Sequence, residues 1–313
     1  MKRLLLAFAL LTLTASAAEP LKARRIVFLG SSVTLSGTSS MSWPHLYAKR
    51  VVFLGDSITY GGQYVVDFSC WLAATHPSIE VLNLGLASET VSGLSEDGHA
   101  GGKFPRPDLH ERLDRVLKAT KPHLVIACYG MNDGIYLPLD EERFKKFRDG
   151  MTRLHEAVRK TSPHIIHLTP AAYDARGEKP YYDDVLARYS AWLLDQRASG
   201  WQVVDIHGWM NKRLAELRRN NPDFTFSRDH VHPDKAGHRV MAQPLLAYFG
   251  GTETAADNTE LRKLVEKRMV LLRNAWLTAT GHKRPGVAPG LPLPEAEKQA
   301  AELTKQINAL LAK

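Results

Sequence analysis

The chain has 313 residues, of which 44% are hydrophobic and 24% charged, and its formal net charge is +8. This length provides ample core for one α/β domain of roughly 200 residues with extensions. The basic residues are interleaved with acidic ones and form no nucleic-acid motif, which favours a solvated surface; attraction to an acidic polysaccharide or a membrane surface is the alternative. Cys70 and Cys128 lack metal-ligand spacing, so we expect two buried residues, with a disulfide as the other possibility.

Residues 1–18 have the pattern of a secretory signal. Lys2 and Arg3 supply the charged start, residues 4–14 are apolar, and residues 15–18 offer small-residue cleavage sites. The apolar run is too short to span a bilayer, and a buried N-terminal helix is the alternative. We therefore expect an exported protein, periplasmic or extracellular, with no stable membrane anchor.

The segment after the expected signal resembles a later segment of the chain. Residues 25–34 resemble residues 50–59 at an offset of 25, with Ser32 opposite Ser57. Because only one of these hydroxyls can face a single histidine, we favour Ser57, which keeps an aspartate before it and a helix after it. Residues 19–49 are then an N-terminal extension: a degenerate duplication, an added edge strand or a poorly ordered leader.

Residues 50–59 predict a buried strand followed by a turn that carries a hydroxyl group. A short, β-branched apolar run ends at Gly55, as is typical of strands buried in parallel sheets. Asp56 and Ser57 then leave the strand at its carboxyl end, where ligands bind in open α/β sheets. Ser57 is therefore the candidate nucleophile.

Strands and helices alternate after this turn. Further strands are predicted over residues 79–84, 123–129, 164–168 and 201–206. Helices are predicted over residues 63–76, 108–120, 140–160, 181–198 and 234–248. This alternation indicates a parallel sheet with right-handed crossovers and helices on both faces.

The C-terminal part, residues 251–313, forms a helical extension. A polar linker over residues 250–258 leads to amphipathic helices at 258–280 and 294–311. One interpretation is a pair of helices packed on the domain surface. The other is a specificity element that brings four residues toward the active-site mouth: Trp276, His282, Lys283 and Arg284.

A serine hydroxyl needs a base before it can attack a carbonyl group. His232 is the candidate base for Ser57, and Asp229, three residues earlier, can fix its tautomer from the same loop. The neighbouring histidines have other interpretations: His230 is expected in the loop and His238 in the packing of the last domain helix.

Four ordered blocks carry a family resemblance. Residues 55–59, 83–90, 130–133 and 229–233 resemble blocks one, two, three and five of the SGNH (GDSL-type) esterases and lipases. The resemblance implies a carboxylic ester hydrolase with a three-layer α/β/α sandwich of the flavodoxin-like type. Its five-stranded parallel sheet would occupy residues 50–250, followed by the C-terminal helical extension.

The resemblance also implies three donors for an oxyanion. They are the backbone N–H of Ser57, the backbone N–H of Ser88 and the side chain of Asn132. Many family members have glycine where Ser88 aligns, and Gly85 is the alternative donor. A backbone donor survives this change if the conformation accepts a β-carbon.

Two further carboxylates are expected to support the site. Asp56 and Asp133 neighbour Ser57 and Asn132, and we interpret both as holding their turns by hydrogen bonds. The sequence has no Gly-x-Ser-x-Gly elbow, which argues against the α/β-hydrolase fold. Its acids and histidines are not at metal spacing, so we expect neither a metal nor a cofactor.

The predicted rim loops over residues 95–107, 134–138 and 170–180 are short, polar and aromatic. They favour a small acyl group on a sugar-like alcohol, and the partner would be a small ester or an acetylated carbohydrate. Exported carbohydrate O-acetyl esterases in the family are similar in this respect. The alternatives are a lysophospholipase, arylesterase or thioesterase, and a non-catalytic carbohydrate-binding protein. The sequence leaves the oligomeric state open.

Overall fold

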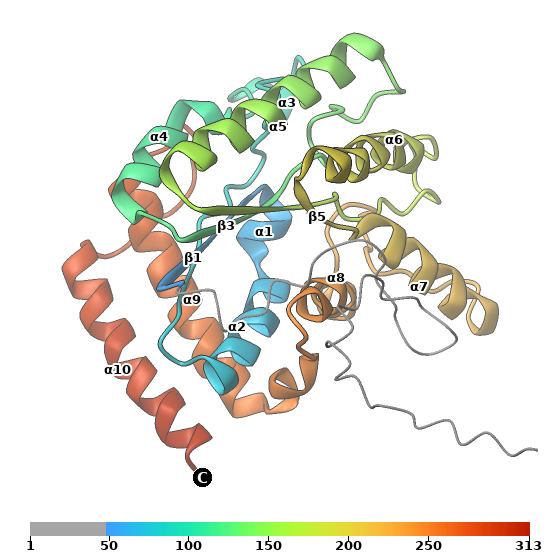
Figure 1. Cartoon of the computed structure of the whole chain (residues 1–313). Helices are drawn as coiled ribbons and strands as arrows, with labels where there is room; N and C mark the ends of the chain where they lie inside the picture. Colours follow the sequence, from blue (N-terminus) through green and yellow to red (C-terminus); the bar gives the residue numbers. More distant parts are fainter. Residues whose placement is uncertain (1–47) are drawn as a thin grey trace, which may run out of the picture. The chain divides into compact units, whose positions relative to one another are not determined.

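A computed structural model of the chain describes residues 48–313 (Figure 1). The expected signal at residues 1–18 and the repeat at residues 25–34, which carries Ser32, lie outside the described residues. All of the described residues belong to one compact unit. Within residues 48–313, no helix combines the length and the hydropathy needed to cross a bilayer.

A five-stranded parallel sheet forms the centre of the fold, in the order β2-β1-β3-β4-β5. The strands are β1 Arg50–Gly55, β2 Glu80–Asn83, β3 Leu124–Cys128, β4 His164–Leu168 and β5 Gln202–Val204. In the central pairing, Val52 of β1 is in register with Leu82 of β2 and Val125 of β3. The five predicted strands are confirmed, and this strand order is that of flavodoxin-like sheets.

Helices cover the sheet on both faces. They are α1 Ser57–Gly61, α2 Gln63–Thr75, α3 His99–Gly102, α4 Leu109–Thr120, α5 Glu141–Thr161, α6 Tyr182–Asp195, α7 His207–Asn220, α8 Lys235–Tyr248, α9 Thr259–Thr280 and α10 Leu293–Leu311, with 3-10 turns at Gln196–Ser199 and Glu253–Asp257. In Figure 1, α4 and α5 lie on one side of the sheet and α2 and α8 on the other. The predicted three-layer sandwich is therefore confirmed.

Three helices were not predicted, namely α1, α7 and the four-residue α3. The turn after β1 continues as the short helix α1, because the carboxylate of Asp56 caps it by accepting the Ile58 N–H at 2.9 Å. Helix α7 follows β5, and only Met210, Leu214 and His207 of its residues are buried. With so few buried positions, the sequence of α7 lacks the apolar periodicity that predicts an amphipathic helix.

The C-terminal helices pack into the same core as the rest of the described chain. Residues of the predicted apolar stripe of α9 are buried, namely Leu261, Val265, Met269, Leu272 and Trp276. Trp276 is 4% exposed and therefore belongs to the core, not to a substrate mouth. Arg284, after α9, lies over the Phe104 ring at 4.8 Å. Cys70 in α2 and Cys128 in β3 are both buried and unbridged.

Candidate active site

Three of the predicted site residues form one series of hydrogen bonds. Ser57 stands at the first position of α1, just beyond the carboxyl end of β1, and its Oγ lies 2.8 Å from Nε2 of His232. The other ring nitrogen of His232, Nδ1, lies 2.6 Å from Oδ2 of Asp229. The two residues of the loop before α8 thus reach the serine at the end of the central strand.

The Asp229 carboxylate is held as an anion by its own loop. Its Oδ1 accepts the backbone N–H of His232 at 2.8 Å and that of Val231 at 3.1 Å. Burial by itself raises the pKa of Asp229, but the backbone N–H and side chain of His232 lower it overall. A carboxylate facing Nδ1 stabilises the tautomer with its proton there, which leaves Nε2 to accept the Ser57 hydroxyl proton.

The predicted oxyanion donors are at the same edge of the sheet. The Ser57 N–H lies in the first turn of α1, where helical N–H groups lack helical acceptors. The Ser88 N–H has no acceptor among residues 48–313, and Ser88 has a φ of +68°. The Gly85 N–H instead donates to Oδ1 of Asn83 at 2.9 Å, so of the two alternatives Ser88 is the one with a free donor.

Close packing explains why residue 85 is a glycine. A β-carbon there would lie 2.5 Å from the backbone nitrogen of Tyr60. The glycine therefore allows α1, which carries Ser57, to approach the loop after β2 closely.

The Asn132 side chain is oriented by two contacts. Its Nδ2 donates to the backbone carbonyl of Glu89 at 3.1 Å, and its Oδ1 accepts the Tyr136 hydroxyl at 3.1 Å. An amide nitrogen carries two N–H groups, so one remains for a further acceptor.

The two supporting carboxylates act on different segments. Asp56 caps its own helix, as expected. Asp133 reaches instead to the neighbouring loop, where its Oδ1 accepts the N–H groups of Val91 and Ser92 at 2.9 and 2.8 Å. Burial, with a smaller contribution from the charge of Asp133, raises the pKa of Asp56 to about 7. Burial likewise raises the pKa of Asp133 to about 6.

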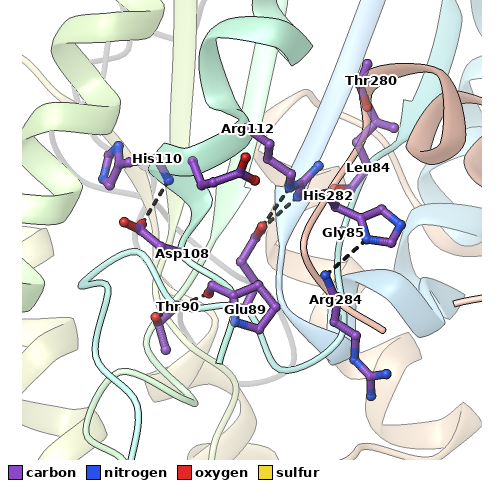
Figure 2. Close-up of polar contacts among 12 residues, drawn as sticks. Leu84, Gly85, Glu89, Thr90, Asp108, His110, Arg112, Thr280, His282 and Arg284 are labelled. Carbon is purple, nitrogen blue, oxygen red and sulfur yellow. Dashed lines mark hydrogen bonds and ion pairs between the residues drawn. The ribbon is translucent and has the colours of Figure 1, made fainter. Parts of the chain in front are cut away.

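A buried ion pair beneath the site was missed by the sequence analysis (Figure 2). Arg112 of α4 is 1% exposed and donates to both carboxylate oxygens of Glu89, at 2.6 and 2.8 Å. The Tyr129 hydroxyl also donates to Glu89, at 2.7 Å, and Arg112 donates to the Leu84 carbonyl at 2.8 Å. The pair fixes the loop that carries Ser88. The sequence feature that could have predicted this pair is an arginine on the apolar face of α4, among Leu109, Leu113 and Val116.

The other histidines near the site have the expected surroundings. His238 of α8 is buried and stacks on Tyr64 with ring centroids 6.0 Å apart, and burial lowers its pKa to about 4. It is a packing residue, as predicted. His230 lies in the loop with a φ of +69°, and its carbonyl accepts the Asp174 N–H at 2.9 Å.

Fold and sequence together define the class of protein. Residues 53–240 match the model of the GDSL-like lipase/acylhydrolase family. Because this match covers more than half of the 313 residues, the chain belongs to that family and is a carboxylic ester hydrolase. The family resemblance inferred from the four sequence blocks is confirmed.

Solved structures with the same fold include two kinds of enzyme. A gut microbial diltiazem-metabolizing enzyme is 23% identical with a TM-score of 0.56, and the alignment covers 66% of this chain and 48% of that one. The chain thus spans about half the length of that enzyme. A catalytic mutant of an acetylxylan esterase from Geobacillus stearothermophilus is 22% identical with a TM-score of 0.51, covering 66% of this chain and 95% of that one. Among curated proteins, none matches the sequence significantly.

Proposed function

We propose that this ester hydrolase removes acetyl groups from carbohydrate, with Ser57 as the nucleophile. The observation that carries the proposal is the hydrogen-bonded series from Ser57 Oγ through His232 to Asp229, with separations of 2.8 and 2.6 Å. A serine, a base and a group that orients the base, each within hydrogen-bond reach of the next, are what acyl transfer to a hydroxyl requires.

The reaction follows from these contacts. Nε2 of His232 takes the hydroxyl proton while Oγ of Ser57 bonds to the ester carbonyl carbon, and the carbonyl oxygen becomes an oxyanion. The C–O bond to the alcohol then breaks, and His232 returns the proton to the leaving oxygen. Water next attacks the acetyl-enzyme by the same route, with His232 as base and acid, and releases acetate.

The oxyanion would be held by three donors: the backbone N–H groups of Ser57 and Ser88 and the Nδ2 of Asn132. Each such donor contributes on the order of 3 kcal/mol to the stability of the transition state. The Ser88 N–H lacks an acceptor within the described residues, which supports its assignment over Gly85.

The surroundings favour a polar alcohol with a small acyl group. Arg106 lies 5.5 Å and Lys179 5.3 Å from the centroid of the Tyr136 ring, which itself contacts Asn132. Glu96 binds the Arg106 guanidinium at 2.6 and 2.7 Å. Aromatic rings and fixed charges of this kind suit a sugar, and the shared fold of an acetylxylan esterase is compatible with such a substrate.

A second candidate is hydrolysis of esters with longer acyl chains. Leu137 and Leu139, in the segment that follows Tyr136, are 41% and 45% exposed. Exposed leucines beside a site can bind an apolar chain. A lysophospholipid, aryl ester or thioester would use them, whereas an acetyl group would not.

The test is acyl release by the purified protein from p-nitrophenyl acetate, butyrate and octanoate, beside acetylated xylan. Acetate-selective turnover together with acetate release from xylan supports the proposal. Rates that rise with chain length support the second candidate. No turnover by folded protein would favour a non-catalytic carbohydrate-binding protein instead.

Two alanine variants assign the nucleophile in the same assay. Ser57→Ala should lower kcat by at least about 10⁴-fold, because the hydroxyl that attacks is gone. Ser32→Ala, the matched serine of the earlier sequence copy, should stay within about twofold of wild type. The reverse result would transfer the assignment to Ser32.

We also propose that the chain is exported, on the pattern of residues 1–18. Mass spectrometry of the protein recovered from the periplasm or medium of expressing cells would give its N-terminus. A start after one of residues 15–18 supports the proposal, and an intact Met1 in cytoplasmic protein contradicts it.

A further inference from the structure

Tyr136 contacts the proposed oxyanion donor from the side opposite Glu89. The Tyr136 hydroxyl donates to Oδ1 of Asn132 at 3.1 Å, while Nδ2 of the same amide donates to the Glu89 carbonyl at 3.1 Å. A carbonyl at one end and a hydroxyl at the other leave Asn132 one amide orientation in which both bonds form. Because the amide group is planar, the hydrogen bond to Glu89 also sets the direction of the second N–H of Nδ2.

The backbone is bent to bring Tyr136 back over Asn132. Ile135 and Tyr136 are consecutive residues in the left-handed region, with φ values of +46° and +56°. The turn is closed by the Ile135 N–H, which donates to the Asn132 carbonyl at 3.0 Å. A β-branched residue rarely adopts this conformation, and such strain persists where the surrounding structure enforces it, often at functional sites.

The surroundings hold the Tyr136 ring in this position. It stacks on Tyr182 with centroids 4.8 Å apart and planes at 27°, and the buried Tyr182 hydroxyl donates to the Met131 carbonyl at 2.8 Å. The cationic groups of Arg106 and Lys179 lie over the Tyr136 ring. Burial raises the pKa of Tyr136 well above its ordinary value, so its hydroxyl keeps the proton that it donates.

We propose that Tyr136 is a positioning residue that fixes the Asn132 amide and strengthens its remaining N–H as a donor to the oxyanion. A donor on an amide oxygen polarises the amide and makes its N–H a stronger donor, as in other hydrogen-bond chains. The effect is expressed when charge develops on the substrate oxygen, so it acts on kcat more than on KM. This inference rests on the proposed role of Asn132.

The test is steady-state kinetics of Tyr136→Phe on p-nitrophenyl acetate. The variant keeps the ring and its stacking and loses only the hydroxyl. We expect kcat to fall roughly 5- to 20-fold with KM within about twofold, since one positioning hydrogen bond is lost. Tyr181→Phe is the matched control: its hydroxyl contacts the backbone carbonyl of Tyr136 at 3.4 Å and not Asn132, so its kcat should stay within about twofold.

A double-mutant cycle separates this role from a structural one. Asn132→Ala should lower kcat by roughly 10²- to 10³-fold, and adding Tyr136→Phe to it should change kcat by less than twofold, because the amide that the hydroxyl orients is gone. An equal loss in both backgrounds, or no loss in Tyr136→Phe alone, would overturn the inference. Wild-type activity in Asn132→Ala would instead refute the proposed oxyanion site itself.

Discussion

The backbone N–H of Asp174 donates to the carbonyl of His230 at 2.9 Å and thereby ties the loop after β4 to the loop that carries His232 and Asp229. The Asp174 carboxylate strengthens this connection. It accepts two hydrogen bonds from Arg218 of α7, at 2.8 and 2.7 Å, and one from the Thr225 hydroxyl at 2.6 Å. Helix α7 thus fixes the segment in which the proposed base stands.

Replacing Asp174 should loosen that segment. Burial by itself raises the pKa of Asp174, but hydrogen bonds from Thr225, Arg218 and Arg176 lower it overall. Asp174→Ala leaves Arg218 without its carboxylate partner, although its Nε still donates to the Phe224 carbonyl. The substitution should lower the free energy of unfolding by roughly 1–3 kcal/mol, measured in urea at pH 7. A carboxylate with a lowered pKa stabilises the fold above its ordinary pKa of 3.8, and the contribution is lost as the pH falls through the lowered value.

The control for Asp174 is an aspartate with an exposed side chain on the adjoining loop. Asp223→Asn should change the free energy of unfolding by less than about 0.5 kcal/mol. Equal effects of Asp174→Ala and Asp223→Asn would mean that the Asp174 carboxylate does not hold the loop.

Ser88→Gly should preserve activity and stabilise the protein. The φ of +68° at Ser88 is unfavourable for a residue with a β-carbon, whereas glycine adopts it without that cost. The substitution should therefore raise the free energy of unfolding by roughly 0.5–1 kcal/mol. The backbone N–H stays in place, so kcat should remain within about twofold. Thermal unfolding and p-nitrophenyl acetate turnover measure both effects.

Replacing a serine that has a negative φ by glycine should change the free energy of unfolding in the opposite direction. Ser92→Gly changes a neighbour in the same loop, where no positive φ favours glycine, and should lower the free energy of unfolding by roughly 0.5–1 kcal/mol. If Ser88→Gly destabilised the protein as much as Ser92→Gly, the serine at position 88 would be making a contact that outweighs its strain.

Local sequence patterns predicted the strands of the sheet and the pairing of Asp229 with His232, and sequence motifs predicted that Ser57 belongs with them. Strands β1 and β3 are short runs of buried apolar residues, and His232 lies three residues from Asp229. The Ser57–His232 contact spans most of the domain, yet both residues lie in blocks that the family resemblance identifies. Local pattern and motif were sufficient for these parts.

The supporting contacts could not be predicted in the same way. Asp174 meets Arg218 only because α7 folds beside the loop after β4, and α7 itself has a narrow apolar face. The Tyr136 hydroxyl reaches Asn132 through two left-handed residues, neither of which is glycine. Partner choice between distant charges and unusual backbone conformations depends on tertiary packing, which no single sequence window contains.

Glu89→Gln should be strongly destabilising. The substitution removes the negative charge that Arg112 faces, and the guanidinium is only 1% exposed. Breaking a buried pair on one side costs roughly 3–5 kcal/mol, because the remaining charge is uncompensated. Urea unfolding with equal m-values would measure the loss.

Glu111→Gln is the matched control for Glu89→Gln. Glu111 pairs with the more exposed Arg115 at 3.0 Å, one turn along α4. Such a surface pair contributes about 0–1 kcal/mol, so its loss should be small. If both variants lost similar stability, Arg112 would be stabilised by contacts other than Glu89.

Asp56→Asn should make the stability of the protein less sensitive to pH. Burial raises the pKa of Asp56 from 3.8 to about 7, so between these values the folded state holds a proton that the unfolded state releases, and wild-type stability falls as the pH rises. Asparagine can still accept the Ile58 N–H but carries no charge. The free energy of unfolding of Asp56→Asn, relative to that of the wild type, should rise by roughly 2 kcal/mol between pH 5 and pH 8, measured by urea unfolding at each pH.

Asp140→Asn, at the exposed N-cap of α5, is the control, and its free energy of unfolding should differ from that of the wild type by less than about 0.5 kcal/mol at both pH values. An Asp56→Asn difference that is equal at pH 5 and pH 8 would show that the ionised Asp56 carboxylate carries no burial cost.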